Sequence, residues 1–363
     1  MYEPSASRPS DSWRVNNFDL IRLLAALQVA CVHAFVHVRA PGFFTHIVDV
    51  GLRLFPGVPI FFVVSGFLIS KSYEHSDSLR DYFRKRCLRI YPGLWACLIV
   101  TVGVMLVAGV GVIGTISTRD WLLWWAAQMT ILQTYNPGFQ WPPGTGVPNS
   151  SLWTIPVELE FYVLLPLIYG LFRLDKRAGN IPLLVVLAAS VALHGAFFYT
   201  DHPIPDSAES RRLLFTVAPY LWMFLVGVLM QRNWSTLRPA LAGRAHWWLL
   251  GYLLLCVVAL RLGIGVGSNT ITPLFLCPLA GLVISAATSA PGCADRILRH
   301  QDISYGTYLY HVLVINLMVS FGFVGSVFAV VSAIAIALLL ATASWVLVEK
   351  PFLRRKHAAL RSL

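Results

Sequence analysis

The chain has 363 residues, of which 57% are hydrophobic and 12% are charged, and its mean hydropathy is +0.67. Soluble domains carry about twice that share of charged residues, so the composition excludes an ordinary soluble protein. Apolar stretches of near-spanning length recur along the whole chain and predict an integral membrane protein. The net charge of +11 does not indicate nucleic-acid binding, because most basic residues lie in short segments between apolar stretches.

The ends and the cysteines add three further expectations. The first eighteen residues are polar and no small-residue cleavage site follows the first apolar stretch, so we expect no cleavable signal peptide. The six cysteines lie in apolar stretches or basic segments, which predicts no structural disulfide. Neither a CxxC pattern nor a Cys/His ligand spacing occurs, so we expect no metal site.

Ten apolar segments predict an all-α fold, a polytopic transmembrane helix bundle with about ten spans. In chain order they are residues 19–38, 55–71, 90–112, 154–172, 181–199, 212–230, 247–264, 271–290, 304–321 and 325–347. The predicted organisation is a cytoplasmic N-terminal segment at 1–18, a transmembrane domain at 19–349 and a cytoplasmic basic tail at 350–363.

The basic residues between the spans predict the orientation. If the segments between successive spans lie on alternating sides of the membrane, 21 of the 28 Lys and Arg fall on one side and six on the other, while Arg22 lies within a span. The positive-inside bias makes the richer side cytoplasmic and places both termini there.

One apolar stretch, residues 121–132, breaks this alternation and is too short for a span. Its three tryptophans are typical of an interface, so we expect a re-entrant or interfacial helix on the outer side. The uncharged segment 133–151 that follows is rich in Pro, Gly and aromatic residues. It is either a lid or acceptor platform over the protein or a packed loop without contact to substrate.

The first span contains two ionisable residues on one face. Eleven positions separate Arg22 from His33, which corresponds to about three turns of helix and a rise of roughly 16 Å. Ionisable groups within a span are costly and usually face a cavity or a partner. The pair therefore predicts a functional route through the membrane.

Six motifs occur in order between residues 17 and 352. They are Asn17-Phe-Asp-Leu-Ile-Arg22 with His33; Phe61-Phe-Val-Val-Ser-Gly-Phe-Leu-Ile69; Arg84-Lys-Arg-Cys-Leu-Arg-Ile-Tyr-Pro92; Leu152-Trp-Thr-Ile-Pro-Val-Glu158-Leu-Glu-Phe-Tyr162; Ile303-Ser-Tyr-Gly-Thr-Tyr-Leu-Tyr-His311; and Glu349-Lys-Pro-Phe352. Together they resemble the acyltransferase-3 family of membrane O-acyltransferases, which O-acetylate bacterial cell-surface polysaccharides, including lipopolysaccharide. The sequence departs from the family pattern at Pro156, inside the fourth motif, and adds a second carboxylate at Glu160.

The resemblance implies transfer of an acyl group, acetyl by default, from cytoplasmic acetyl-CoA to a hydroxyl. The acceptor would be a cell-envelope carbohydrate: a polysaccharide, an O-antigen or a lipid-linked glycan. The implied location is the bacterial inner membrane, with membrane lipid as the surrounding partner. We expect no nucleic-acid partner.

The first helix would carry the chemistry. We expect Arg22 to bind the donor and His33 to act on the acyl group, either as the general base on the acceptor hydroxyl or as a transient acyl-imidazole. Glu158 either orients His33, as the third group of a triad does, or forms a structural ion pair with Arg22 or Arg53. Ser65 serves either as a small packing residue or as a nucleophile.

Further residues are expected to bind the donor. Arg86 and Arg89 lie at the cytoplasmic entry of the third span and can bind the phosphates of CoA, although positive-inside bias also explains them. Tyr305 and His311 either line the CoA channel or belong to a structural aromatic cluster.

Two other classes of function remain open at this stage. Buried Arg, His and Glu in a ten-span bundle also suit a proton-coupled membrane transporter, although no convincing internal repeat is found. A polysaccharide-assembly component without catalysis is the other alternative.

Overall fold

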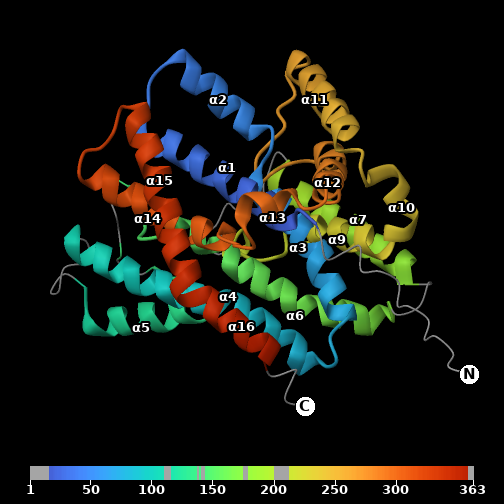
Figure 1. The fold of residues 1–363 in the computed structure, drawn as a ribbon, viewed down its shortest axis with the longest axis horizontal. Helices are drawn as coiled ribbons and strands as arrows, with labels where there is room; N and C mark the ends of the chain where they lie inside the picture. The colour runs from blue at the N-terminus through green and yellow to red at the C-terminus, as the bar shows by residue number, and fades with distance from the viewer. Residues whose placement is uncertain are drawn as a thin grey trace, which may run out of the picture.

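The computed structural model describes residues 16–109, 116–136, 139, 144–174, 179–199 and 212–358, which form helices joined by turns and irregular segments, with no β-strand among them (Figure 1). The helices are α1 (Phe18–Val38), α2 (Phe43–Arg53), α3 (Gly57–Glu74), α4 (Leu79–Val107), α5 (Thr118–Met129), the 3-10 turn η1 (Ser150–Trp153), α6 (Thr154–Phe172), α7 (Asn180–Phe198), α9 (Leu221–Arg232), α10 (Trp234–Leu241), α11 (Ala245–Arg261), α12 (Pro273–Ala287), α13 (Cys293–Leu298), α14 (Ser304–Ser320), α15 (Val327–Ser344), the π-helical turn η3 (Trp345–Glu349) and α16 (Lys350–Ala358).

The predicted all-α class is confirmed, and each of the ten apolar segments contains a helix. Six described helical segments are long and apolar enough to cross a membrane, and a seventh results if α10 and α11, bent by 81°, form one broken span. The chain is therefore a multi-pass membrane protein. A count of ten spans stays a prediction, because α9 has only 12 residues and α12 only 15, whereas a span needs about 20.

The third predicted span begins eleven residues earlier than expected, because the basic segment before it is helical. Ser78 caps α4 by accepting a hydrogen bond from the Asp81 backbone N–H at 3.1 Å. Asp81 then pairs with Lys85 one turn later. Both interactions favour helix at this end. As a result Arg86 and Arg89 lie on a helix rather than in a loop.

α1 packs against α3, α14 and α15 and lies near the centre of the bundle (Figure 1). α3 also packs closely against α9. A Cβ added at Gly66 of α3 would clash with the Phe224 carbonyl oxygen, and one at Gly227 of α9 would clash with the Val63 carbonyl oxygen. Small residues thus let these two backbones approach each other.

α5 runs back along α4 after the chain leaves the end of that helix (Figure 1). The Trp95 indole N–H of α4 donates to the Met129 carbonyl oxygen at the end of α5, over 3.1 Å. The predicted helix at 121–132 is present three residues earlier, at Thr118–Met129, and its re-entrant or interfacial position in the membrane stays a prediction.

The described part of the segment 133–151 is hydrogen-bonded to α14. The Asn316 side chain accepts from the Thr145 N–H at 2.8 Å and donates to the Val147 and Pro148 carbonyl oxygens. Asn149 donates to the Leu309 carbonyl oxygen at 2.8 Å. These contacts pack residues 144–151 against α14, while the two alternatives for their role, a lid or acceptor platform and a loop without contact to substrate, stay predictions.

The two predicted terminal segments are only partly described. Residues 1–15 of the N-terminal segment lie outside the described residues, as do residues 359–363 of the tail. The described part of the tail is not irregular but continues as the helix α16.

Candidate functional site

A basic cavity of about 350 Å³ lies where α1, α3, α4, α6 and the segment before α14 meet. The cations and carboxylates that line it are Arg22, Lys85, Arg86, Arg89, Asp19, Glu158 and Asp302. The four cations outnumber the three carboxylates by only one. The cavity can bind an anionic ligand, but its own carboxylates neutralise most of its positive charge.

Asp302 is the centre of this charge network and was not predicted from the sequence. Its Oδ2 accepts from Arg22 Nη1 at 2.8 Å and from Arg89 Nη2 at 2.6 Å. Its Oδ1 accepts from the Ser304 hydroxyl at 2.5 Å. Two of the predicted donor-binding arginines are therefore joined through one carboxylate. The sequence feature that could have indicated Asp302 is its position as an acidic residue directly before the motif Ile303–His311, next to a basic segment.

Asp302 lies in the short connection between α13 and α14, outside the spanning helices. Burial alone would raise the pKa of its carboxyl, but the Arg22 and Arg89 guanidinium groups outweigh burial and hold the pKa well below its ordinary value. The Asp302 carboxyl is therefore ionised at neutral pH.

Arg86 differs from the other cations of the cavity in having no carboxylate partner among the described residues. Its Nη2 donates to the Ser72 hydroxyl at 3.0 Å, and its guanidinium lies 5.8 Å from the centroid of the Tyr162 ring. Its Nε is buried without a hydrogen-bond partner. Arg86 is therefore the arginine of the cavity that no carboxylate of the described residues neutralises. Lys85, by contrast, is paired with Asp81.

A narrow passage continues from the basic cavity into the bundle. The two share Arg22, Ser65, Glu158 and Tyr305. Further in, the passage is lined by apolar side chains, including Phe61 and Ile155, and ends at Thr154 and Tyr308. Its volume of about 40 Å³ holds a few water molecules at most.

Glu158 lies in the wall between the cavity and the passage, not beside His33. It accepts from the Tyr162 hydroxyl, and the Ser65 hydroxyl is 3.5 Å away. No described contact joins it to Arg22 or to Arg53, which pairs instead with Asp49 at 2.8 Å. Neither contact considered for Glu158 from the sequence is present. The added carboxylate Glu160 has a structural use, since it accepts from the Val217 N–H at 2.8 Å.

His33 contacts His311 instead. His33 Nδ1 is 3.0 Å from His311 Nε2, and the two rings are stacked with their centroids 5.2 Å apart. His311 Nδ1 is in turn 2.7 Å from the Tyr308 carbonyl oxygen. His311 is fully buried, whereas His33 is half-buried. Both nitrogens of His311 are thus engaged within the protein.

The contacts of Tyr305 and Tyr308 connect the two ends of the site. The Tyr305 hydroxyl donates to the Ile90 carbonyl oxygen at 3.1 Å, and Arg89 lies 5.7 Å from the centroid of its ring. The Tyr308 ring packs 6.0 Å from that of Phe61 in the passage and 5.7 Å from that of His311. Since α1 is one uninterrupted helix, Arg22 at the cavity and His33 beside His311 are held at a fixed separation.

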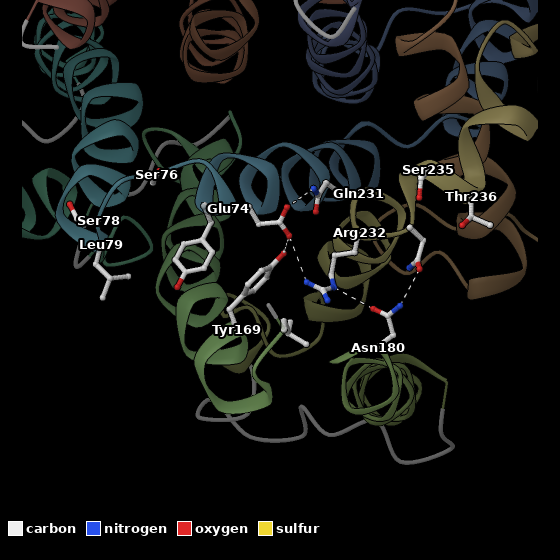
Figure 2. A pocket seen from close by; sticks show the side chains of 13 residues that line it. Glu74, Ser76, Ser78, Leu79, Tyr169, Asn180, Gln231, Arg232, Ser235 and Thr236 are labelled. Carbon is white, nitrogen blue, oxygen red and sulfur yellow. Dashed lines mark hydrogen bonds and ion pairs between the residues drawn. The ribbon is translucent and has the colours of Figure 1, made fainter. Parts of the chain in front are cut away.

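A second, larger cavity of about 920 Å³ contains none of the predicted site residues (Figure 2). Its polar groups contact one another: Glu74 accepts from Tyr169 and Gln231 at 2.9 Å each and lies 3.7 Å from Arg232. Arg232 also donates to Asn180 at 3.3 Å. Because Glu74 and Arg232 pair with each other in its wall, neither charge is left unpaired for a ligand.

Residues 15–349 match the profile of the acyltransferase-3 family, described as an acyltransferase domain. The chain belongs to this family. The matched region includes every helix of the site, from α1 to α14 and on to η3.

Several curated proteins are similar to this acyltransferase over most of their length. Nodulation protein 10 of Rhizobium leguminosarum bv. viciae is 35% identical, with 96% of each chain covered. An O-acetyl transferase of Shigella phage Sf6 is 26% identical, over 95% of this chain and 98% of the relative. The exopolysaccharide production protein ExoZ of Rhizobium meliloti (strain 1021) is 25% identical, over 83% and 90%. No solved structure gives a significant match.

Proposed function

We propose that the protein moves an acetyl group from cytoplasmic acetyl-CoA to a hydroxyl of a cell-envelope carbohydrate. The observation that carries this proposal is the basic cavity that continues through the narrow passage to Tyr308, whose ring lies 5.7 Å from that of His311, the partner of His33. Acetyl-CoA has an anionic head group, which suits the basic cavity, and a thin pantetheine arm, which suits the narrow passage. Family membership supplies the class of reaction.

In this proposal the donor enters at the basic end. Arg86, with its unsatisfied Nε, binds a phosphate of CoA, and Arg22 and Arg89 stabilise the head group through the network around Asp302. The pantetheine arm passes Tyr305 and Glu158, whose carboxylate accepts from an amide N–H of the arm. The side chains of the passage must move aside for the arm, because the free passage is too small for it.

The acyl transfer then takes place at His33. Nε2 of His33 removes the proton from the acceptor hydroxyl while the oxygen attacks the thioester carbonyl carbon. The C–S bond breaks, and the CoA thiolate takes the proton from the His33 imidazolium, so the products are an ester and free CoA. A covalent acyl-imidazole at the same nitrogen gives the same products in two steps.

The acceptor is proposed from the relatives' names. One relative is an O-acetyl transferase and another an exopolysaccharide production protein, which favours a polysaccharide, an O-antigen or a lipid-linked glycan. We propose the bacterial inner membrane as the location, with both termini cytoplasmic. The transporter alternative receives no support from these relatives.

Transfer of radiolabel from [acetyl]-CoA to envelope glycans tests the proposal. Membranes that contain the wild-type protein are expected to label a glycan, and His33→Ala is expected to abolish this labelling at equal expression. His37→Ala is the matched control, since it removes the neighbouring histidine one turn further along α1 and is expected to leave labelling intact. Labelling that survives His33→Ala would contradict the role of His33.

A further inference from the structure

We propose that His311 is the positioning residue for His33: it fixes the His33 tautomer with the proton on Nδ1 and leaves Nε2 bare for the reaction. This inference rests on the proposed function and deepens it. It gives His311 a role different from the donor contact expected from the sequence.

The direction of the hydrogen bonds follows from the last acceptor in the chain. A carbonyl oxygen can only accept, so His311 Nδ1, 2.7 Å from the Tyr308 carbonyl oxygen, must carry the proton. A neutral His311 then has a lone pair on Nε2. His33 Nδ1, 3.0 Å from that nitrogen, must donate to it. The neutral His33 therefore has its free lone pair on Nε2.

The neutral form of His311 is the one that its surroundings favour. The side chain is fully buried, and no carboxylate forms an ion pair with it or with His33 in the described residues. A buried imidazolium without a counter-charge is costly. In a serine hydrolase an aspartate holds the catalytic histidine; here a neutral imidazole and a backbone carbonyl would do so.

The Tyr308 carbonyl is itself held in place from the outer side. The Ser151 hydroxyl, which donates to Asn149 Oδ1 at 2.6 Å, lies 3.2 Å from this carbonyl oxygen, and the Tyr308 hydroxyl donates to the Ser151 carbonyl oxygen at 2.9 Å. Thr154 donates to the same Tyr308 hydroxyl at 2.8 Å. The start of α6 and the turn before it thus fix the group that orients His311, which in turn orients His33.

Two amide substitutions separate positioning from mere packing. The amide of His311→Gln reaches the place of Nε2 and can accept from His33, whereas the amide of His311→Asn reaches only the place of Nδ1 and can contact Tyr308 alone. We expect His311→Gln to retain most of the wild-type kcat. We expect His311→Asn and His311→Leu to lower kcat about 10²-fold or more with the donor KM unchanged.

A spectroscopic measurement tests the tautomer without relying on activity. The ¹⁵N spectrum of histidine-labelled protein, assigned by comparison with His33→Ala, is expected to show His33 protonated on Nδ1 in the wild type and in His311→Gln. In His311→Asn the His33 signals are expected to shift toward the Nε2–H form.

Three results would overturn the proposal. They are a wild-type His33 protonated on Nε2, equal kcat in the Asn and Gln variants, and a folded Gln variant as inactive as the Leu variant. Failure of the proposed function is distinguishable, because it would abolish glycan labelling in the wild type and leave the tautomer signal as predicted.

Discussion

At the scale of single residues, Arg86 is the cation of the basic cavity whose contacts leave most for a ligand. Its Nε is buried and unsatisfied, and it has no carboxylate partner among the described residues. Arg22 and Arg89 are already neutralised in part by Asp302. Charge alone, as the sequence gives it, does not distinguish these three arginines.

Arg86→Ala is therefore expected to raise the KM for acetyl-CoA by about tenfold, the effect of one charge-assisted hydrogen bond, with kcat little changed. Steady-state kinetics in detergent or nanodiscs measure both constants. Lys85→Ala is the matched control, because Lys85 is engaged by Asp81 and should change KM less. A fall in kcat at constant KM would place Arg86 at the reacting atoms instead.

Asp302→Asn is expected to destabilise the fold strongly, by about 3 kcal/mol or more, because it leaves two arginines without their counter-charge. A lower midpoint in thermal unfolding of the purified protein would show this. Asp295→Asn serves as the control: the Asp295 side chain is 41% exposed and contacts only the 80% exposed His300 in an ion pair, so its loss should change little. Equal midpoints for both variants would contradict the structural role of Asp302.

The same carboxylate makes a prediction about pH. Its pKa is lower in the folded than in the unfolded protein, so its contribution to stability is complete above the unfolded value of about 3.9. That contribution is lost as the pH falls below this value toward the folded pKa. The thermal midpoint of the wild type should therefore fall on acidification below about pH 4, and Asp302→Asn should lack this part of the fall.

At the scale of elements, the crossing of α3 and α9 depends on two glycines. A methyl group at Gly66 or Gly227 would meet a backbone carbonyl oxygen of the other helix, which cannot rotate away as a side chain can. The helices would have to separate, and Ser65, next to Gly66, would move in the wall of the passage.

Gly66→Ala and Gly227→Ala are each expected to destabilise the protein by roughly 1–3 kcal/mol and to lower acyl transfer. Thermal unfolding and glycan labelling report the two effects. Gly103→Ala in α4 and Gly170→Ala in α6 are matched controls, since a Cβ at either position meets no atom within 4 Å. If all four variants behaved alike, close approach of α3 and α9 would not be the reason for the glycines.

At the scale of the whole molecule, the sequence predicts the elements well and their contacts poorly. Apolar periodicity places a helix in every expected segment, and the eleven-residue spacing of Arg22 and His33 is preserved on one straight helix. Periodicity defines a face within a helix but not which neighbour that face meets. For that reason Glu158 was considered for His33, whereas the residue in contact is His311.

Two other differences have the same kind of physical cause. Asp302 lies in a short connection that has no apolar periodicity. Its contacts with Arg22 and Arg89, which are 280 and 213 positions away in the sequence, form only when the helices pack together. The number of spans depends on breaks such as the 81° bend between α10 and α11, which lies at Gly243 in a left-handed conformation with φ of 74°. Hydropathy alone does not register such a bend.

The narrowness of the passage has a consequence for the cell that carries this enzyme. In the proposed reaction a cytoplasmic thioester meets an acceptor on the far side of the membrane, and an open path between the two sides would also conduct ions, each elementary charge gaining about 2.3 kcal/mol per 100 mV of membrane potential. The passage, lined by Phe61 and Ile155, has only about 40 Å³ of free space and holds a few water molecules at most. Under the proposed function the donor arm would fill the passage as it opens it, so acyl transfer would not require an open path for ions.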